Sequence, residues 1–295
     1  MRGKQLNEES KTATRANPWR FFALALGLSW LFWIPLALLG QEALKFPFVI
    51  LMIAGGLSPA IAEVILIARS HDRAQWRDYR QRVLDFRRIS AGWWAVILLT
   101  FPILNGIAIS LNLLLTGEQP DFETAARLLS QPWMILPFAV FILLFGPLPE
   151  ELGWRGYGLD SLQARWNALT SSLILGAMWA LWHLPLFFMA GTFQHDEVGF
   201  GTPGFWSFCF GTTISSILFT WIYNNTNRST LSAILFHFSI NFSGEFLTPT
   251  ERARLYQLLL TGLMAVAVTL IWGPQTLTRR RVGKEGDLLT RRAER

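Results

Sequence analysis

Two adjacent glutamates stand near the end of an apolar stretch and are followed by an arginine, in the run Glu150-Glu151-Leu-Gly-Trp-Arg155. Pro149 suits the first position of a helix, and on such a helix Glu151 and Arg155 are four residues apart and can form an ion pair. Glu150 points about 100° away from Glu151 and has no partner close by in the sequence. The spacing therefore predicts a structural role for Glu151 with Arg155 and leaves Glu150 available for acid–base chemistry. Two solvated glutamates at a helix N-terminus are the alternative.

Two histidines and an asparagine lie within other apolar stretches of the chain. His183 follows Trp179 by four residues, so both side chains share one helix face and Trp179 could form the wall of a pocket. His237 and Asn241 have the same spacing and address one point in a helix bundle. Glu245 continues that stripe, although its place at a helix end favours an interfacial charge. Histidine and asparagine also serve as plain interhelical hydrogen-bond partners, so packing roles stay open for them.

Taken together, these polar side chains predict hydrolysis of a carbonyl compound. Ionisable groups at membrane depth cost roughly 2.5–3.5 kcal/mol each and are therefore candidates for a functional site. Two histidines and a glutamate match a catalytic zinc (Zn²⁺) site with an open position for water, which makes Glu150, His183 and His237 candidate metal ligands. Without a metal, Glu150 could take a proton from a water that His183 positions. His237 and Asn241 would then donate hydrogen bonds to a tetrahedral oxyanion.

The composition indicates that lipid is the main solvent of this chain. Of 295 residues, 52% are hydrophobic and 16% are charged, whereas soluble domains have about 25% charged residues. The chain contains 14 Trp and 23 Phe, and Trp is enriched where membrane helices meet lipid headgroups. The net charge of +6 could suggest a nucleic-acid partner. The arginines, however, gather beside apolar segments and do not alternate with exposed aromatics along a groove, so we expect a lipid bilayer and no nucleic acid.

Eight apolar stretches approach the length of about 20 residues that a helix needs to cross a bilayer. We therefore expect an all-α, polytopic integral membrane protein. The expected segments are Trp19–Leu39, Phe46–Ala68, Trp93–Leu115, Pro132–Leu152, Leu169–Ala190, Trp206–Tyr223, Leu231–Leu247 and Leu255–Trp272.

The distribution of Lys and Arg predicts the orientation of these segments. Basic residues are frequent before the first segment, between the second and third, and after the last, whereas residues 117–131 and 191–205 contain only Arg127. With eight crossings the basic regions share one side, which the positive-inside rule places in the cytoplasm of the cell. We expect a cytoplasmic tail over residues 1–18, a membrane domain over 19–274, and a basic, disordered, cytoplasmic tail over 275–295.

The basic stretch between the second and third segments, Arg73 to Arg88, has two interpretations of equal weight. It could be a solvated cytoplasmic loop. It could also be a basic helix lying on the membrane surface, because a helix over this stretch would gather its large apolar residues on one side. Those residues are Trp76, Tyr79, Val83 and Phe86.

The motifs resemble those of the CPBP family, which contains the type II CAAX prenyl endopeptidases and bacteriocin-processing or self-immunity membrane proteins. The family pattern is EExxxR, then FxxxH, then HxxxN; the first and third motifs fit fully, and the second has Trp179 at the Phe position. The resemblance covers about residues 132–247, a core within the membrane domain. It implies active residues Glu150, His183, His237 and Asn241, supported by Glu151, Arg155 and Trp179.

The resemblance implies an intramembrane endopeptidase, metal- or glutamate-dependent. In its prenyl-processing members the reaction removes a C-terminal tripeptide after a lipidated cysteine, so the expected substrate is a membrane-associated peptide or a prenylated protein. One alternative is a non-hydrolytic immunity or scaffold protein that binds a peptide or a partner. Another is a proton-coupled transporter that uses Glu150 and His183 as a relay, although the sequence has no inverted repeat to support it.

Overall fold

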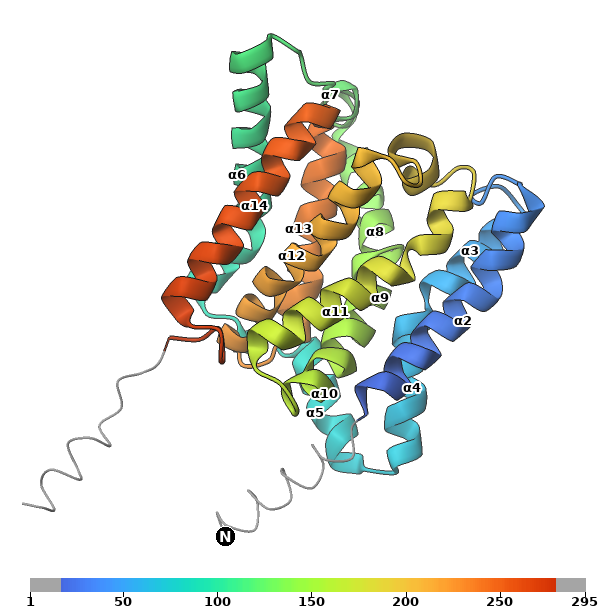
Figure 1. Ribbon diagram of the computed structural model, residues 1–295, viewed down its shortest axis with the longest axis vertical. Helices are drawn as coiled ribbons and strands as arrows, with labels where there is room; N and C mark the ends of the chain where they lie inside the picture. The colour runs from blue at the N-terminus through green and yellow to red at the C-terminus, as the bar shows by residue number, and fades with distance from the viewer. Residues whose placement is uncertain (1–16, 280–295) are drawn as a thin grey trace, which may run out of the picture.

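The computed structural model describes residues 17–279, and this part of the chain consists of helices joined by turns and loops, without a β-strand (Figure 1). The expected all-α fold is confirmed, while most of the two expected tails, residues 1–16 and 280–295, lies outside the described residues. The long helices are α2 (Pro18–Leu39), α6 (Ala91–Thr116), α11 (Ala168–Trp182), α12 (Pro203–Asn225), α13 (Thr230–Leu247) and α14 (Glu251–Trp272). The shorter elements are α3 (Val49–Gly56), α4 (Ser58–Ser70), α5 (Arg73–Leu84), η1 (Phe86–Arg88), α7 (Glu123–Ser130), η2 (Pro132–Met134), α8 (Ile135–Leu144), α9 (Pro147–Gly153), η3 (Trp154–Gly158), α10 (Leu159–Gln163), η4 (Leu184–Phe188) and η5 (Gln194–Val198).

Six helical segments in residues 17–279 are long and apolar enough to cross a membrane, and the pair α3–α4, bent by 47°, gives a seventh if it counts as one span. These findings agree with the expected polytopic membrane protein. The helix α13 is not among them, and it packs inside the bundle against α6, α8, α9 and α12. The expected count of eight crossings therefore stays a prediction, in which the pair α3–α4 is the seventh crossing and α13 is the eighth. The six segments are Pro18–Leu39, Ala91–Thr116, Pro132–Gln163, Ala168–Phe188, Pro203–Asn225 and Glu251–Trp272.

The fourth membrane segment is longer than the sequence pattern suggested. The expected end at Leu152 is wrong, because the helical segment continues through α9, η3 and α10 to Gln163. Glu150 therefore stands 13 residues before the end of its segment, about 20 Å at 1.5 Å per residue. His183 stands at the C-terminal end of α11, 15 residues after Ala168, or about 22 Å. Glu150 and His183 consequently lie at similar depth. The sequence pattern had placed Glu150 at the inner end of its segment and His183 near the middle of the membrane.

Small residues let the fourth segment pack tightly against α4. A Cβ atom at Gly153 would collide with the backbone of Pro59, and one at Gly156 would collide with the carboxyl group of Glu63. Gly156 lies in η3, a π-helical turn that follows the two glutamates directly. Such single π turns inside helices occur often at functional sites. The close approach fixes the position of α9, and with it the position of the candidate site.

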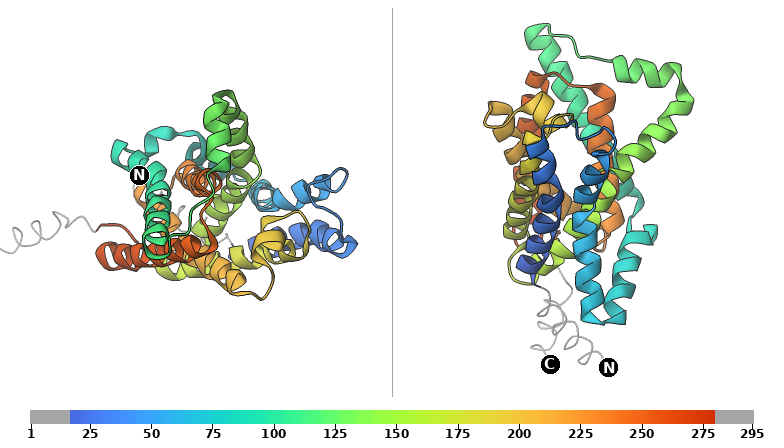
Figure 2. Two further views of the ribbon diagram at one scale, coloured as in Figure 1. Left: turned by 90° about the horizontal axis from the view of Figure 1, so that it is seen from above. Right: turned by 90° about the vertical axis from the view of Figure 1, so that its right-hand side faces the viewer.

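Both ends of the described chain lie at the same end of the bundle (Figures 1 and 2). The ring of Trp19, near the start of α2, lies 6.3 Å from that of Trp166 in the turn between α10 and α11. In the same turn, Ala168 N–H donates a 2.9 Å hydrogen bond to the carbonyl of Gln275, which follows α14. Because residues 17 and 279, where the described part of the chain begins and ends, lie on one side, an even number of crossings fits this arrangement.

Candidate active site

Glu150 and His183 are both held by one tryptophan. Trp179 Nε1 on α11 donates a 2.6 Å hydrogen bond to Glu150 Oε2 on α9. The carbonyl of Trp179 lies 2.8 Å from His183 Nδ1, and because a carbonyl only accepts, Nδ1 carries the proton. His183 Nε2 is therefore the ring nitrogen left to act on a substrate or a water. All three residues are buried, with exposed fractions of 5–8%.

The predicted pair Glu151 and Arg155 is present, with Arg155 Nη1 3.0 Å from Glu151 Oε1 and neither side chain exposed. Arg155 Nη2 also donates a 3.1 Å hydrogen bond to Ser216 Oγ on α12. The guanidinium group stands over the rings of Trp179 and Phe219, at 4.7 and 4.0 Å from their centroids. This pair thus connects the fourth segment to α11 and α12 through a hydrogen bond and cation–π contacts.

His237 joins the same cluster through Glu151. His237 Nδ1 lies 3.0 Å from Glu151 Oε1, and a carboxylate acceptor requires a proton on that nitrogen. Its ring centroid is 5.2 Å from that of Trp179. The face of Trp179 therefore lies close to His237, while its Nε1 holds Glu150. Glu151 has two functions in this arrangement, since it pairs with Arg155 and orients His237.

Asn241 reaches the site from the next turn of α13. A Cβ atom built on Gly146, at the break between α8 and α9, would lie 3.2 Å from Asn241 Nδ2 and 3.8 Å from Glu150 Oε1. Both side chains therefore face the same small space above Gly146, which a larger residue would fill. The structure thus brings Glu150, Trp179, His183, His237 and Asn241 together. Glu245 is exposed near the end of α13 and makes no contact with them.

The predicted zinc ligands do not form a metal cage in this arrangement. Within residues 17–279, no three His, Cys, Asp or Glu side chains are placed so that they could hold one metal ion. The hydrogen bonds to Glu150 Oε2 and to the Nδ1 atoms of His183 and His237 leave Glu150 Oε1 and both Nε2 atoms free, so it is the placing of the side chains that departs from a zinc cage. A zinc site with two histidines and one glutamate needs all three ligands on one ion. The residues as placed do not fit it, and we derive no step through a metal.

Two polar residues of this region were not predicted from the sequence. Ser216 accepts from Arg155, and it looks like an ordinary serine of an apolar segment. Glu63, on α4, is fully buried, and its carboxyl group packs against Gly156 in η3. The signal for Glu63 was available, because it is a single acidic residue within the apolar stretch Phe46–Ala68 and such residues are candidates by default.

An apolar groove begins directly after His183. It has a volume of about 480 Å³ and lies between α2 and η4. Its lining is almost entirely aliphatic and aromatic, which suits a lipid chain better than a polar ligand. The lining residues are Trp30, Ile34, Ala37, Leu38, Leu184, Pro185, Phe187, Phe188 and His195.

Comparison with known proteins gives one family and one relative. Residues 132–243 match the family model of the Rce1-like type II CAAX prenyl endopeptidases. The chain is also 28% identical over 259 residues to CAAX prenyl protease 2 of Methanococcus maripaludis, covering 86% of this chain and 93% of the relative. The matched residues include both glutamates, both histidines and Asn241. The Rce1-like domain over residues 132–243 and the similarity over most of the chain support a type II CAAX protease of the CPBP family.

Proposed function

We propose that the protein is an intramembrane endopeptidase that cuts a peptide bond near the C-terminus of a prenylated, CAAX-type substrate. The observation that carries this proposal is that one residue, Trp179, holds both Glu150 and His183. A carboxylate and an imidazole nitrogen fixed at similar depth can bind one water between them. The carboxylate then acts as the base, and the imidazole nitrogen accepts a hydrogen bond from the water. The name of the relative supports the substrate class.

The proposed reaction is hydrolysis by water with Glu150 as the base. His183 Nε2 accepts a hydrogen bond from the water, and Glu150 takes a proton as the water oxygen attacks the scissile carbonyl. The C–N bond then breaks, and Glu150 returns the proton to the leaving amine, which yields a carboxylic acid and a free N-terminus. The proton count balances without a further reactant.

His237 and Asn241 stabilise the oxyanion of the tetrahedral intermediate. Asn241 Nδ2 donates from the space above Gly146. His237 Nε2 donates when that nitrogen carries a proton, while Nδ1 of the same ring faces Glu151 Oε1 at 3.0 Å.

The groove beside His183 supports a prenylated substrate over an unmodified peptide. An apolar volume of about 480 Å³ accepts an isoprenoid chain, and one of its lining residues, Leu184, follows His183 directly in the chain. We propose that the chain lies in this groove while the peptide bond reaches Glu150. The basic ends of the bundle then face the cytoplasm, where such substrates are found.

The test is cleavage of a farnesylated CAAX peptide by the full-length protein in proteoliposomes, with the released tripeptide measured by mass spectrometry. We expect Glu150→Gln to lower kcat by about 10³-fold, because general acid–base catalysis contributes about 10²–10⁴-fold. The control is Glu245→Gln, which removes an exposed carboxylate and should leave kcat unchanged. If folded Glu150→Gln, His183→Ala and His237→Ala proteins all kept full activity, the proposed reaction would be wrong.

The same variants separate hydrolysis from the alternative of a binding or immunity protein. A binding protein would retain its peptide affinity and its protective effect in Glu150→Gln, and the wild type would release no tripeptide. A transporter would instead show uptake that depends on a pH gradient. Release of tripeptide by the wild type and not by Glu150→Gln would contradict both alternatives.

A further inference from the structure

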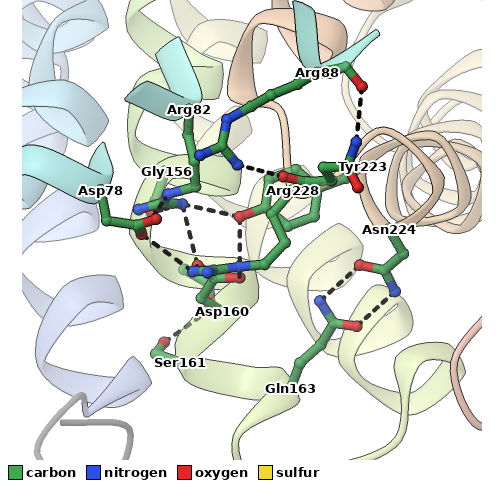
Figure 3. A network of polar contacts seen from close by, with 12 residues as sticks. Asp78, Arg82, Arg88, Gly156, Asp160, Ser161, Gln163, Tyr223, Asn224 and Arg228 are labelled. Carbon is green, nitrogen blue, oxygen red and sulfur yellow. Dashed lines mark hydrogen bonds and ion pairs between the residues drawn. The ribbon is translucent and has the colours of Figure 1, made fainter. Parts of the chain in front are cut away.

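The short helix α5 is fixed to the bundle by a buried arginine on one of its faces. Arg82, 3% exposed, donates from Nη1 to the carbonyl of Gly156 at 2.8 Å, to Asp160 Oδ2 at 3.1 Å and to the hydroxyl of Tyr223 at 2.9 Å. Its Nε lies 2.9 Å from Asp78 Oδ2. Figure 3 shows these contacts meeting between α5, α10 and α12. The polar face of α5 that carries Asp78 and Arg82 is thus fully engaged.

A second cation completes this attachment. Arg228, in the turn between α12 and α13, forms an ion pair with Asp160 and lies 3.4 Å from Asp78 (Figure 3). The Asp160 carboxylate raises the pKa of Arg228, so this arginine stays charged. The apolar side of α5 also turns inward: Tyr79 is buried, and Trp76 and Val83 pack against the core. The apolar side of α5 therefore covers protein at Tyr79 and Val83, whereas Trp76 is only partly buried and Phe86 is exposed.

Three arginines occupy the opposite face of α5. At 100° per residue, Arg73, Arg77 and Arg80 lie within about 60° of one another and about 180° from Arg82. All three are exposed. Among residues 17–279 none of them has an acidic partner, because every ion pair found there involves other residues. A helix held through one face thus presents three uncompensated cations on the other.

These arginines line a groove of about 650 Å³. The groove also contains apolar surface, since the indole of Trp76 forms part of it and Leu84 is 67% exposed. One carboxylate, that of Asp85, is present, and it accepts a 3.1 Å hydrogen bond from the backbone N–H of Arg87. The groove therefore carries mostly positive charge beside some apolar surface. We call it the α5 groove. Its residues are Arg73, Trp76, Arg77, Arg80, Gln81, Leu84 and Asp85.

The α5 groove lies at a membrane boundary. Arg73 follows Ser70, the last residue of the bent span α3–α4, by three positions, and α5 lies at the end of the bundle that also holds the start of α2 (Figure 1). Phe86, just beyond the groove, is 59% exposed. Arginine clusters immediately outside a membrane helix attract anionic headgroups, and exposed aromatic and aliphatic side chains beside them suit the glycerol and upper acyl region.

We propose that the α5 groove binds the phosphodiester headgroup of an anionic phospholipid from the leaflet at this end of the bundle. The guanidinium groups of Arg73, Arg77 and Arg80 bind the phosphate oxygens, for which their planar fork geometry is suited. Leu84 and the Trp76 indole contact the lipid below its phosphate. The site is separate from Glu150 and its neighbours, and this proposal does not rest on the proposed function.

The test measures thermal unfolding of the full-length protein in a non-ionic detergent. Short-chain phosphatidylglycerol is titrated in, with phosphatidylcholine of the same chain length and inorganic phosphate as separate arms. A ligand that binds the folded state raises the unfolding midpoint in a saturable way. We expect a saturable rise with phosphatidylglycerol and a rise less than half as large with phosphatidylcholine or phosphate. A full rise with inorganic phosphate alone would indicate a free-anion site and overturn the lipid proposal.

The matched variants are two triple substitutions that each remove three positive charges. Arg73→Gln with Arg77→Gln and Arg80→Gln should raise the half-saturating phosphatidylglycerol concentration at least fivefold. Arg20→Gln with Arg69→Gln and Arg87→Gln removes exposed arginines at the same end but outside the groove, and should change it less than twofold. Equal effects of the two triple variants would overturn the proposal, because they would indicate diffuse surface charge.

Two further variants keep the proposal testable if the groove triple variant does not fold. The single substitution Arg77→Gln should raise the half-saturating concentration at least twofold. The triple substitution of the groove arginines by lysine, which keeps the charge, should saturate within threefold of the wild type. A single variant indistinguishable from the wild type, or a lysine variant as weak as the glutamine one, would contradict the assigned roles.

Discussion

Trp179 Nε1 donates a 2.6 Å hydrogen bond to Glu150 Oε2, although the two residues lie 29 positions apart on different helices. The backbone of the same tryptophan holds His183. Trp179 stands where the family pattern has phenylalanine, which cannot donate such a bond. In this chain the aromatic position of the second motif is therefore a positioning residue for the candidate base, in addition to a wall of the pocket.

We expect Trp179→Phe to lower kcat about tenfold to a hundredfold, because a hydrogen bond to a charged group contributes about 1.5–3 kcal/mol. KM for the farnesylated peptide should change little, since the indole contacts the base and not the groove. Steady-state kinetics in proteoliposomes measure both constants. The control is Trp33→Phe, which removes a 3.0 Å indole bond to the carbonyl of Met52 away from the site. A fall in kcat of the same size in the control would contradict the assigned role.

The buried pair Glu151 and Arg155 should be a large contributor to stability. We expect Arg155→Met to lower the free energy of unfolding by about 3–5 kcal/mol, because it leaves an unpaired carboxylate in the bundle. Reversible denaturation in detergent micelles measures this. Lys45→Met is the comparison, since Lys45 forms an exposed 2.7 Å pair with Glu42 and such pairs contribute about 0–1 kcal/mol. Similar losses in the two variants would mean that Arg155 is not held as described.

The groove beside His183 predicts a separation of KM from kcat. Ala37→Trp places an indole in the groove and should raise KM for a farnesylated peptide about tenfold, equivalent to about 1.4 kcal/mol. Its kcat should stay within about twofold of the wild type, because Ala37 does not contact the catalytic cluster. Leu31→Trp alters the same helix at a position 63% exposed and outside the groove. Unchanged KM in Ala37→Trp would place the isoprenoid chain elsewhere.

Metal analysis addresses the zinc hypothesis directly. With the side chains as placed, we expect purified protein to contain far less than one equivalent of zinc and to keep its activity in the presence of a chelator. Elemental analysis and a cleavage assay on the same sample provide the two readings. About one equivalent of zinc with chelator-sensitive cleavage would mean that Glu150, His183 and His237 rearrange around a metal.

The sequence predicted the members of the site but not its depth. Glu151 and Arg155 look like the polar end of a membrane helix, so the expected segment stopped at Leu152. In the structure these two charges compensate each other and contact His237 and Ser216, all from within the bundle. Local hydropathy cannot detect such pairing between helices, and it therefore ended the segment about eleven residues too early.

The contacts that fix α5 were also beyond the reach of sequence patterns. The spacing of Tyr79, Trp76 and Val83 correctly indicated an apolar helix face, but it could not say whether lipid or protein covers that face. The answer depends on Arg82, which bonds to Asp160 and Tyr223 far along the chain. Fold class and motif residues follow from composition and short-range spacing, whereas pairings over 60 to 140 positions require the tertiary structure.

In the proposed reaction, the depth of Glu150 limits which substrates can be processed. The carboxylate stands 13 residues from the end of its segment, about 20 Å inside the bundle. An extended peptide advances about 3.3–3.6 Å per residue, so a substrate entering from that end needs about six unfolded residues between its folded domain and the cleaved bond. Under the proposed function, cleavage would therefore depend on the length of the substrate's tail. A protein whose folded domain ends closer to its lipidated cysteine would not be cleaved, whatever its terminal sequence.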